Sequence, residues 1–207
     1  MRKSVRLIIT TFDIPAGGSL EIPEGSLVTP SAQELALARG VLIVQKPAHE
    51  IEGRAAAEAT VALGADHGGF EMKQALLPVF RQMGLIVRDV GIHEPKTVDY
   101  PDIAVQVAEL VASGEAARGV IIDGAGIGSA MVANKVPGIR AALCYDVASA
   151  RNSREHNNAN VLTLGGRLLT VAQAEQVLRV WLAAAFAGGR HAARVAKIAG
   201  IEKRYSS

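Results

Sequence analysis

The sequence is poor in cysteine, in aromatic residues and in long hydrophobic runs. Its single cysteine, Cys144, excludes an intramolecular disulfide framework and favours a reducing compartment. The apolar stretch behind the basic start, residues 7–10, is too short for a secretory signal, and no run is long enough to span a membrane. Aromatic residues make up only 4% of the chain, as suits close packing of helices on a sheet. We therefore expect a cytoplasmic protein that does not enter a membrane.

Neither sign of charge is in clear excess. The chain has 22 basic and 20 acidic residues, a net charge of +2 and no basic block, which argues against nucleic acid as a partner. Its apolar fraction of 49% is ordinary for a soluble globular protein. A length of 207 residues allows one good-sized domain and a smaller addition.

Residues 1–58 differ in pattern from the rest and predict a small α/β appendage. Thr29-Pro30 is a typical helix start, and Gly40 ends that helix. The pattern predicts a strand, a helix, a second strand and a polar, alanine-rich linker, at residues 5–11, 31–39, 41–44 and 47–58.

Residues 59–207 form the main domain, in which strands and helices alternate. The strands are expected at residues 60–63, 85–90, 120–122, 139–144 and 161–164. The helices are expected at residues 69–83, 101–112, 129–135, 147–155 and 171–186, with a last one reaching about residue 205. Five such units predict a doubly wound, Rossmann-like α/β fold, with a five-stranded parallel sheet and helices on both faces. Ligands of such folds bind at the carboxyl ends of the strands.

A glycine-rich turn follows the third of these strands, in the segment RGVIIDGAGIGSAMVANK. Asp123 ends the strand, and Gly124, Gly126 and Gly128 lead into the next helix. Strand, glycine turn and helix start make a cup of backbone N–H groups that suits an anion, with the Asp123 carboxylate expected on its lip. The segment is neither a dinucleotide fingerprint nor a P-loop. An ordinary strand-to-helix turn is an equally good interpretation of the spacing alone.

Polar residues gather at the carboxyl ends of the other strands too. Asp66-His67 follow the first strand, Asp99-Tyr100 close the loop after the second, and Tyr145-Asp146 follow the fourth. Together with Asp123 they should lie at one edge of the sheet. Asp66 and Asp146 could equally be helix caps, and Tyr100 and Trp181 could serve packing alone.

Four motifs in order carry a family resemblance: VALGADHGGFEMK, VDYPDIA, ANKVPGIRAALCYDVASARNSREHNNANVLTLGGR and FAGGRHAARVAKI. From residue 60 to about 201 the chain resembles ribose-5-phosphate isomerase type B and its galactose-6-phosphate isomerase relatives. The resemblance implies interconversion of an aldose phosphate and a ketose phosphate through an enediolate, without metal or organic cofactor. It also implies a homodimer or tetramer whose active sites are shared between subunits, working in pentose phosphate metabolism.

The resemblance also implies roles for individual residues. His67, Arg190 and Arg194 resemble the phosphate ligands, and Asp66 resembles the residue that holds sugar hydroxyls. His156 resembles the group that opens the sugar ring and Asn157 a ligand of the enediolate, both reaching in from the neighbouring subunit. The remaining positions match an anion hole and a pocket wall: Gly124, Ala125, Gly126 and Gly128 for the hole, and Tyr100 for the wall.

Each of these residues also has a plainer interpretation. Arg190 and Arg194, four apart, share a helix face and can grip one phosphate, but such a pair is more often solvated. His67 and His156 taken singly are surface or core histidines, and Asn157 is a turn former. The ordered set of motifs favours the site.

The chain departs from the family pattern in the glycine-rich turn. The best-known branch has a cysteine base where this chain has Asp123, and a threonine thought to assist ring opening where it has Ala125. Another branch has a glutamate base in the place of Ser129. A carboxylate is a weaker base than a thiolate, but carboxylates do run enediol isomerisations, so we predict that Asp123 is the base. Ala125 favours a substrate that cannot cyclise, such as a tetrose phosphate, whereas the retained His156 favours a pentose phosphate, which we place first.

Two other functions stay open. The main domain could bind a phosphosugar without catalysis, with Asp123 left from lost chemistry. The segment IPAGGSLEIPEGSLVTPSAQELALARGV resembles N-terminal segments of bacterial microcompartment accessory proteins, which would make the appendage a docking module. A purely structural extension is the alternative for that appendage.

Overall fold

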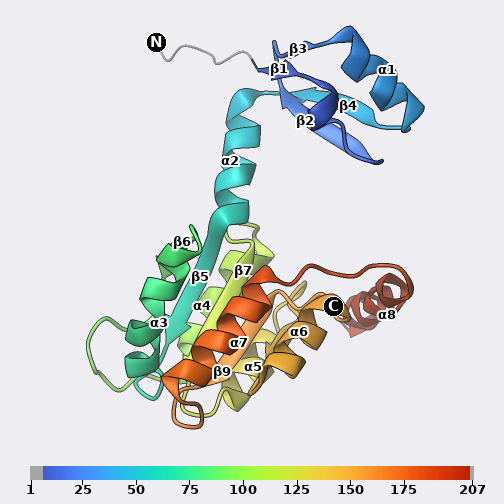
Figure 1. Cartoon of the computed structure of the whole chain (residues 1–207). Helices are drawn as coiled ribbons and strands as arrows, with labels where there is room; N and C mark the ends of the chain where they lie inside the picture. Colours follow the sequence, from blue (N-terminus) through green and yellow to red (C-terminus); the bar gives the residue numbers. More distant parts are fainter. Residues whose placement is uncertain (1–6, 206–207) are drawn as a thin grey trace. The chain divides into compact units, whose positions relative to one another are not determined.

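A computed structural model describes residues 7–205, apart from the side chains of residue 52 and residues 54–58. The chain divides into two compact units, Met1–Ala56 and Ala57–Ser207 (Figure 1). Among the described helices, none combines the length and the apolar character that crossing a membrane would require.

In the first unit, two small parallel sheets and the helix at residues 30–38 surround a cluster of aliphatic side chains that includes Ile9 and Ile22. Strand pairs β1–β3 and β2–β4 form the sheets. The elements are β1 (Ile8–Ile9), the 3-10 helix η1 (Thr11–Asp13), β2 (Ser19–Pro23), β3 (Leu27–Val28), α1 (Pro30–Ala38) and β4 (Leu42–Lys46). Thr29 caps α1 as expected, since its hydroxyl accepts a hydrogen bond from the Ala32 N–H. The predicted first strand is reduced to β1, and its residues 5 and 6 lie outside the described part of the chain.

Residues 47–58, predicted as a linker, include the boundary between the two units and are helical from Ala48 onward. This segment forms α2 (Ala48–Ala59). Alanine and glutamate have high helix propensity, and Pro47 stands just before the first turn, where proline is well tolerated. The polar, alanine-rich composition favours a helix, but this helix has little apolar face. The spacing of apolar residues therefore did not predict it.

The second unit is built on a five-stranded parallel sheet with the order β6-β5-β7-β9-β8. Its strands are β5 (Thr60–Ala65), β6 (Ile86–Asp89), β7 (Arg118–Asp123), β8 (Ala141–Leu143) and β9 (Val161–Gly165). The predicted doubly wound parallel sheet is confirmed. β7 occupies the centre, so the glycine-rich turn behind it opens at the middle of the carboxyl edge.

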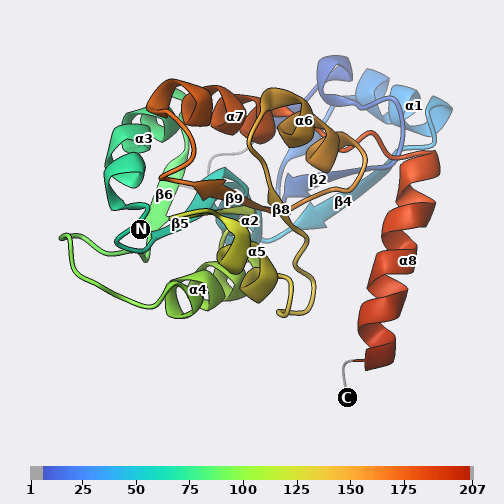
Figure 2. The same ribbon diagram turned by 90° about the horizontal axis from the view of Figure 1, so that it is seen from below.

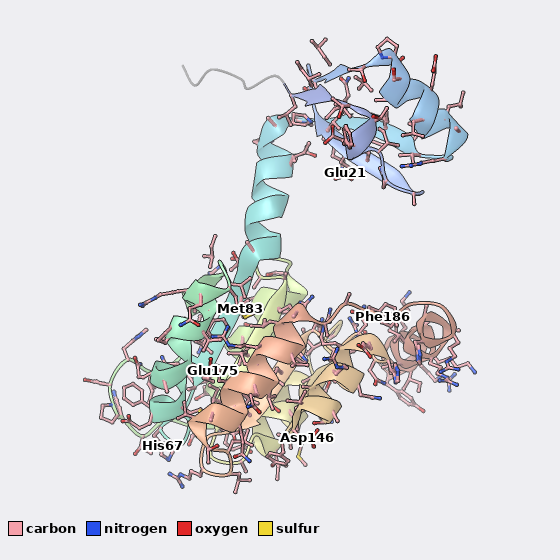
Figure 3. The ribbon with its side chains drawn as sticks, viewed as in Figure 1. Glu21, His67, Met83, Asp146, Glu175 and Phe186 are labelled. Atoms are coloured by element: carbon pink, nitrogen blue, oxygen red, sulfur yellow. The ribbon has the colours of Figure 1, made fainter. Side chains whose placement is uncertain are left out.

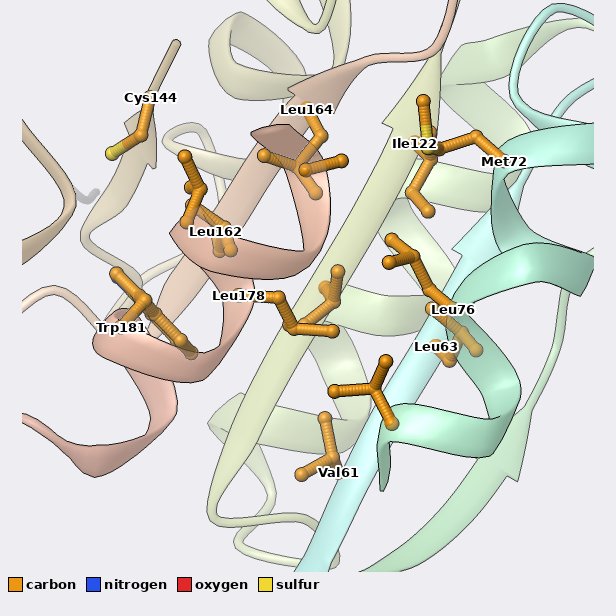
Figure 4. Close-up of a cluster of buried hydrophobic side chains, with 14 of the residues drawn as sticks. Val61, Leu63, Met72, Leu76, Ile122, Cys144, Leu162, Leu164, Leu178 and Trp181 are labelled. Carbon is orange, nitrogen blue, oxygen red and sulfur yellow. The ribbon is translucent and has the colours of Figure 1, made fainter. Parts of the chain in front are cut away.

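Helices cover both faces of this sheet (Figure 2). One face carries α3 (Phe70–Gln82), α6 (Val147–Glu155) and α7 (Val171–Ala183), and the other carries α4 (Tyr100–Ala112) and α5 (Ile127–Ala133). Successive residues of β7 serve opposite faces. Ile122 belongs to the cluster that includes Leu76 and Trp181 on the first face (Figure 4). Ile121 belongs with Val107 to the cluster on the second face. Burial on both faces explains why the strand reads as an uninterrupted apolar run.

The last helix, α8 (Arg190–Tyr205), lies beyond the edge strand β8 and beside α6 in both views (Figures 1 and 2). Its C-terminal part is tied to the chain ahead of β8, because the Gly138 N–H donates to Glu202 Oε1 at 2.7 Å. α8 is therefore next to the amino end of β8, away from the carboxyl ends of the strands.

Candidate active site

Three loops meet at the carboxyl edge of the sheet and form a floor of main chain. A Cβ atom on Gly68 would come within 2.9 Å of the Gly124 nitrogen, and one on Gly166 within 2.7 Å of the Gly68 oxygen. Glycine at these positions lets the loops after β5, β7 and β9 pack backbone against backbone. Figure 3 shows His67 and Asp146 at this same edge of the unit.

The Asp123 carboxylate is turned under the glycine-rich turn. Its Oδ1 atom accepts hydrogen bonds from the N–H groups of Ala125, at 2.8 Å, and Gly126. Its Oδ2 atom accepts from the N–H of Ser129 at 3.1 Å and from the Ser129 hydroxyl at 2.5 Å. Asp123 is only 5% exposed, so the expectation that its carboxylate sits on the lip of the cup was wrong. The N–H groups of the turn attract it inward, and there it holds the turn and the start of α5 together.

Asp123 uses only part of the cup. The N–H groups of Gly124, Ile127 and Gly128 have no hydrogen-bond acceptor within the described residues. Gly126 reverses the chain here with a φ of +78°, a conformation that favours glycine. The turn therefore keeps backbone donors for a ligand, although two of the expected ones, on Ala125 and Gly126, are already occupied.

Asp66 holds the turn ahead of α3 and also contacts its neighbour in the chain. Its Oδ1 atom accepts from the N–H groups of Gly68 at 2.8 Å and Gly69 at 3.0 Å, at the start of α3. Its Oδ2 atom is 3.9 Å from Nδ1 of His67, whose side chain is 40% exposed. Asp146 is the N-cap of α6 and accepts from the Ser149 N–H at 2.7 Å. Asp146 thus has the capping role that the sequence left open, whereas Asp66 binds the turn before the Gly69 cap and faces the loop floor.

Two tyrosines hold the glycine-rich turn from its sides. The Tyr100 ring lies against Gly128, where an added Cβ would come within 2.5 Å of ring carbons. The Tyr145 hydroxyl donates to the Ala125 carbonyl at 2.7 Å. Both rings are partly accessible, at 40% and 39% exposure. They form two walls beside the cup.

Arg167 is a residue that the sequence analysis did not single out. It is exposed, and its Cδ atom is 3.7 Å from where a Cβ atom on Gly124 would lie. Its guanidinium therefore brings a positive charge to the floor of the cup beside Gly124. The signal was available, because Arg167 follows β9 at the carboxyl edge just as Asp66 follows β5.

A second polar group lies at the amino edge of the sheet. His156 caps the C-terminal end of α6, which runs back from the carboxyl edge, and His191 stands in the first turn of α8. Their rings stack with centroids 4.1 Å apart and planes 4° apart. Asn157 is exposed and lines a groove of about 680 Å³ between α8 and the residues around β8.

This second group is rich in positive charge. Burial lowers the pKa of His191, and His156, Arg190 and Arg194 lower it further by repulsion. Burial also lowers the pKa of Arg154 to about 10, so its guanidinium stays charged at neutral pH. It donates to the carbonyl groups of Ala159 and Ala184, which fixes the chain on both sides of the histidine pair. The exposed Arg190 and Arg194 are left able to bind an anion.

The two groups cannot meet within one chain. β9 (Val161–Gly165) separates the turn at Asn160 from the loop at Gly166, and five residues of strand span about 16 Å at ~3.3 Å each. The structure therefore gathers Asp66, His67, Tyr100 and the glycine-rich turn in one group at the carboxyl edge of the sheet. The second group, at the amino edge, contains His156, Asn157, Arg190 and Arg194.

Comparison with known proteins gives one consistent result. Residues 61–198 match the family described as Ribose/Galactose Isomerase. Ribose-5-phosphate isomerase B of Escherichia coli is 42% identical over 144 residues, which cover 70% of this chain and 97% of that protein. D-erythrulose-4-phosphate isomerase of Pectobacterium atrosepticum is 39% identical over 145 residues, which cover 69% of this chain and 95% of that protein.

Solved structures agree with the sequence relatives. Ribose-5-phosphate isomerase B of Clostridium thermocellum superposes with a TM-score of 0.70 at 49% identity, covering 71% of this chain and 99% of that one. The type B ribose 5-phosphate isomerase of Trypanosoma cruzi gives a TM-score of 0.70 at 39% identity, covering 72% and 99%. The matched part corresponds to the second unit, and the first unit lies outside the family match.

Proposed function

Because this chain belongs to the ribose/galactose isomerase family and is an aldose–ketose isomerase for phosphorylated sugars, we propose that it interconverts ribose 5-phosphate and ribulose 5-phosphate. The observation that carries the proposal is the cup after β7, which keeps free backbone donors and is flanked by His67 and Arg167. Backbone donors suit an enediolate oxygen, and the two side chains suit a phosphate.

The working unit is a homodimer, alone or within a tetramer. Each chain carries its two groups of site residues on opposite edges of its sheet, each group an incomplete half-site, and a two-fold axis would bring one edge of each chain to the other edge of its partner. Apolar side chains support such contacts: Ile127 is 46% and Met131 64% exposed beside the cup, and Ile201 is 55% exposed on α8. The phosphate would then be held by His67 and Arg167 of one chain and by Arg190 and Arg194 of its partner.

The reaction needs one proton moved between adjacent carbons. In the open-chain aldose a base takes the proton from C2, the electrons form the C1–C2 double bond, and the enediolate oxygens rest on the N–H groups of Gly124 and Gly128. The base returns the proton to C1, while the proton of the C2 hydroxyl passes to O1. Asp123 is the proposed base. To act, the carboxylate must be released by the Ser129 hydroxyl, which donates to its Oδ2 atom, and must turn from its buried position toward the cup.

A tetrose phosphate is the second candidate substrate. Ala125 has no hydroxyl with which to assist ring opening, and its carbonyl is taken by Tyr145. A four-carbon aldose whose O4 carries the phosphate cannot close a furanose ring, so it needs no such assistance. The Pectobacterium relative, named D-erythrulose-4-phosphate isomerase, supports this alternative.

Isomerisation in D₂O of four-, five- and six-carbon aldose phosphates tests the proposal. The wild type should incorporate deuterium at C2 most rapidly with ribose 5-phosphate, and Asp123→Asn should lose exchange while still binding the sugar. Asp146→Asn, which removes another capping carboxylate at the same edge, is the matched control and should exchange at the wild-type rate. Sugar binding without any exchange would show a phosphosugar-binding protein instead of an enzyme.

The first unit has two candidate roles, docking to another protein or extending the structure. Exposed apolar residues, with Phe12 at 98% and Leu37 at 85%, favour docking. Deleting residues 1–56 should leave isomerase activity in place. Unchanged partners and assembly after the deletion would favour the structural role.

A further inference from the structure

The imidazole of His156 has a hydrogen-bond partner on its own helix. Asn152 lies one turn earlier on α6, and its side-chain amide nitrogen is 2.8 Å from Nδ1 of His156. An amide nitrogen can only donate, so Nδ1 is the accepting nitrogen of the ring. The proton of the neutral imidazole is then on Nε2.

The stack with His191 holds the same ring in its plane. The two rings are parallel to within 4°, and His191 is 8% exposed. Burial lowers the pKa of His191, so this neighbour stays neutral near pH 7 and offers a ring face instead of a charge. The charged groups in the first two turns of α8 are Arg190 and Arg194, and those in the last two turns of α6 are Arg151, Arg154 and Glu155.

We propose that Asn152 is a positioning residue that, together with His191, fixes His156 as the Nε2–H tautomer. Neutral His156 then presents an N–H donor to the sugar. This inference rests on the proposed function. It states that His156, the residue that resembles the family's ring-opening group, donates its hydrogen bond to the sugar. Residues that fix the tautomer of a catalytic histidine act through that histidine and need no contact with the substrate.

The donor has a defined task when a furanose ring opens. The bond between C1 and the ring oxygen breaks, and its electron pair goes to the ring oxygen, which accepts a hydrogen bond from Nε2–H. That oxygen takes a proton from water, and the C1 hydroxyl gives its proton to water as the C1 carbonyl forms. A bare Nε2 would place a lone pair against the developing alkoxide and raise the barrier.

Two substitutions separate this role from a structural one. Asn152→Asp supplies a carboxylate that accepts from Nδ1–H, which reverses the tautomer. Asn152→Leu removes the partner altogether. Asn152 is exposed on α6, so both variants should fold. Arg151→Ala is the matched control, because Arg151 is the preceding exposed residue and pairs with Glu155 at 3.5 Å.

The direct readout is the ¹⁵N spectrum of the full chain with labelled histidine. The chain has five histidines, and the His156 signals are those that vanish in His156→Gln. The wild type and Arg151→Ala should show a protonated Nε2 and a bare Nδ1 at pH 8, and Asn152→Asp the reverse. A protonated Nδ1 in the wild type, with the amide oxygen accepting, would overturn the inference.

The kinetic readout compares a sugar that cyclises with one that cannot. Both Asn152 variants should lose at least about tenfold in kcat/KM with ribose 5-phosphate and less than about threefold with erythrose 4-phosphate. Equal losses of kcat/KM on both sugars would overturn the inference, because the substitutions would then impair a step other than ring opening. A wild type that turns over neither sugar refutes the proposed function, whereas the spectrum still decides the tautomer.

Discussion

Replacing Asp123 by asparagine should loosen the turn on which the site is built. The carboxylate accepts four hydrogen bonds, from the N–H groups of Ala125, Gly126 and Ser129 and from the Ser129 hydroxyl. Asparagine has one acceptor oxygen in place of two, and its NH₂ must face one pair of these donors. The NH₂ group fits better on the Ser129 side, because the Ser129 hydroxyl can rotate and accept a hydrogen bond from it. The Ser129 N–H is then left without an acceptor.

The cost follows from that one buried donor. An unsatisfied buried N–H costs about 1–3 kcal/mol, and the bonds that remain weaken because the acceptor is no longer charged. For a domain of this size each kcal/mol lowers the melting temperature by about 2–4 °C. We therefore expect Asp123→Asn to melt roughly 2–12 °C below the wild type.

Differential scanning calorimetry at one protein concentration and at pH 7 measures the shift. Ser129→Ala removes only the hydroxyl bond and should cost about 1 kcal/mol, which places it between the wild type and Asp123→Asn. Asp146→Asn, an exposed cap, should cost less than Asp123→Asn. An Asp123→Asn protein that melts with the wild type would refute the claim that this carboxylate holds the turn.

Three further predictions concern other parts of the two half-sites. Arg167→Gln should lower kcat/KM about 10- to 100-fold, mostly by raising KM, because a charged phosphate contact is lost. Arg151→Gln should leave both constants unchanged in the same steady-state measurements. An unchanged KM in Arg167→Gln would show that Arg167 does not contact the phosphate. Gly128→Ala should lower the free energy of unfolding by about 1–3 kcal/mol, because the added Cβ would lie 2.5 Å from the Tyr100 ring. In a Tyr100→Ala background the same substitution should cost less. Equal losses in both backgrounds, measured by urea denaturation, would contradict the packing of Tyr100 on Gly128. The pKa of His191 is lowered in the folded state from the ordinary histidine value of 6.5. Below pH 6.5 the unfolded chain therefore binds more protons than the folded chain, so the free energy of unfolding should fall as the pH drops through 6.5. His191→Gln should remove this part of the pH dependence in thermal melts at pH 5 to 8, and an identical pH profile in the variant would count against it.

Much of the second unit could be predicted because its signals are local and repeated. The bounds predicted for α6, residues 147–155, are those observed, since Asp146 is a typical N-cap. The apolar run of β7 and the glycines behind it predicted the central strand and its turn. The rule that polar residues follow the strands of a parallel sheet led to Asp66, His67 and Tyr100.

The rest depends on geometry that the sequence does not carry. Whether the carboxylate of Asp123 points out to a substrate or in to N–H groups is decided by the fold of the turn, and the sequence is compatible with both. The position of β9 between β7 and β8 is set by tertiary packing. α2 escaped notice because its alanines and charges carry no apolar stripe, and its propensity alone indicated a helix.

The separation of the two half-sites is the central claim, and mixed oligomers test it most directly. Chains with Asp123→Asn and chains with His156→Gln, each carrying a different tag, should be nearly inactive alone. In a doubly tagged dimer one site would combine the intact cup of one chain with the intact His156 of the other, so activity should recover to about half of the wild type. A doubly tagged dimer no more active than the two parent variants would show that each site is built within a single chain.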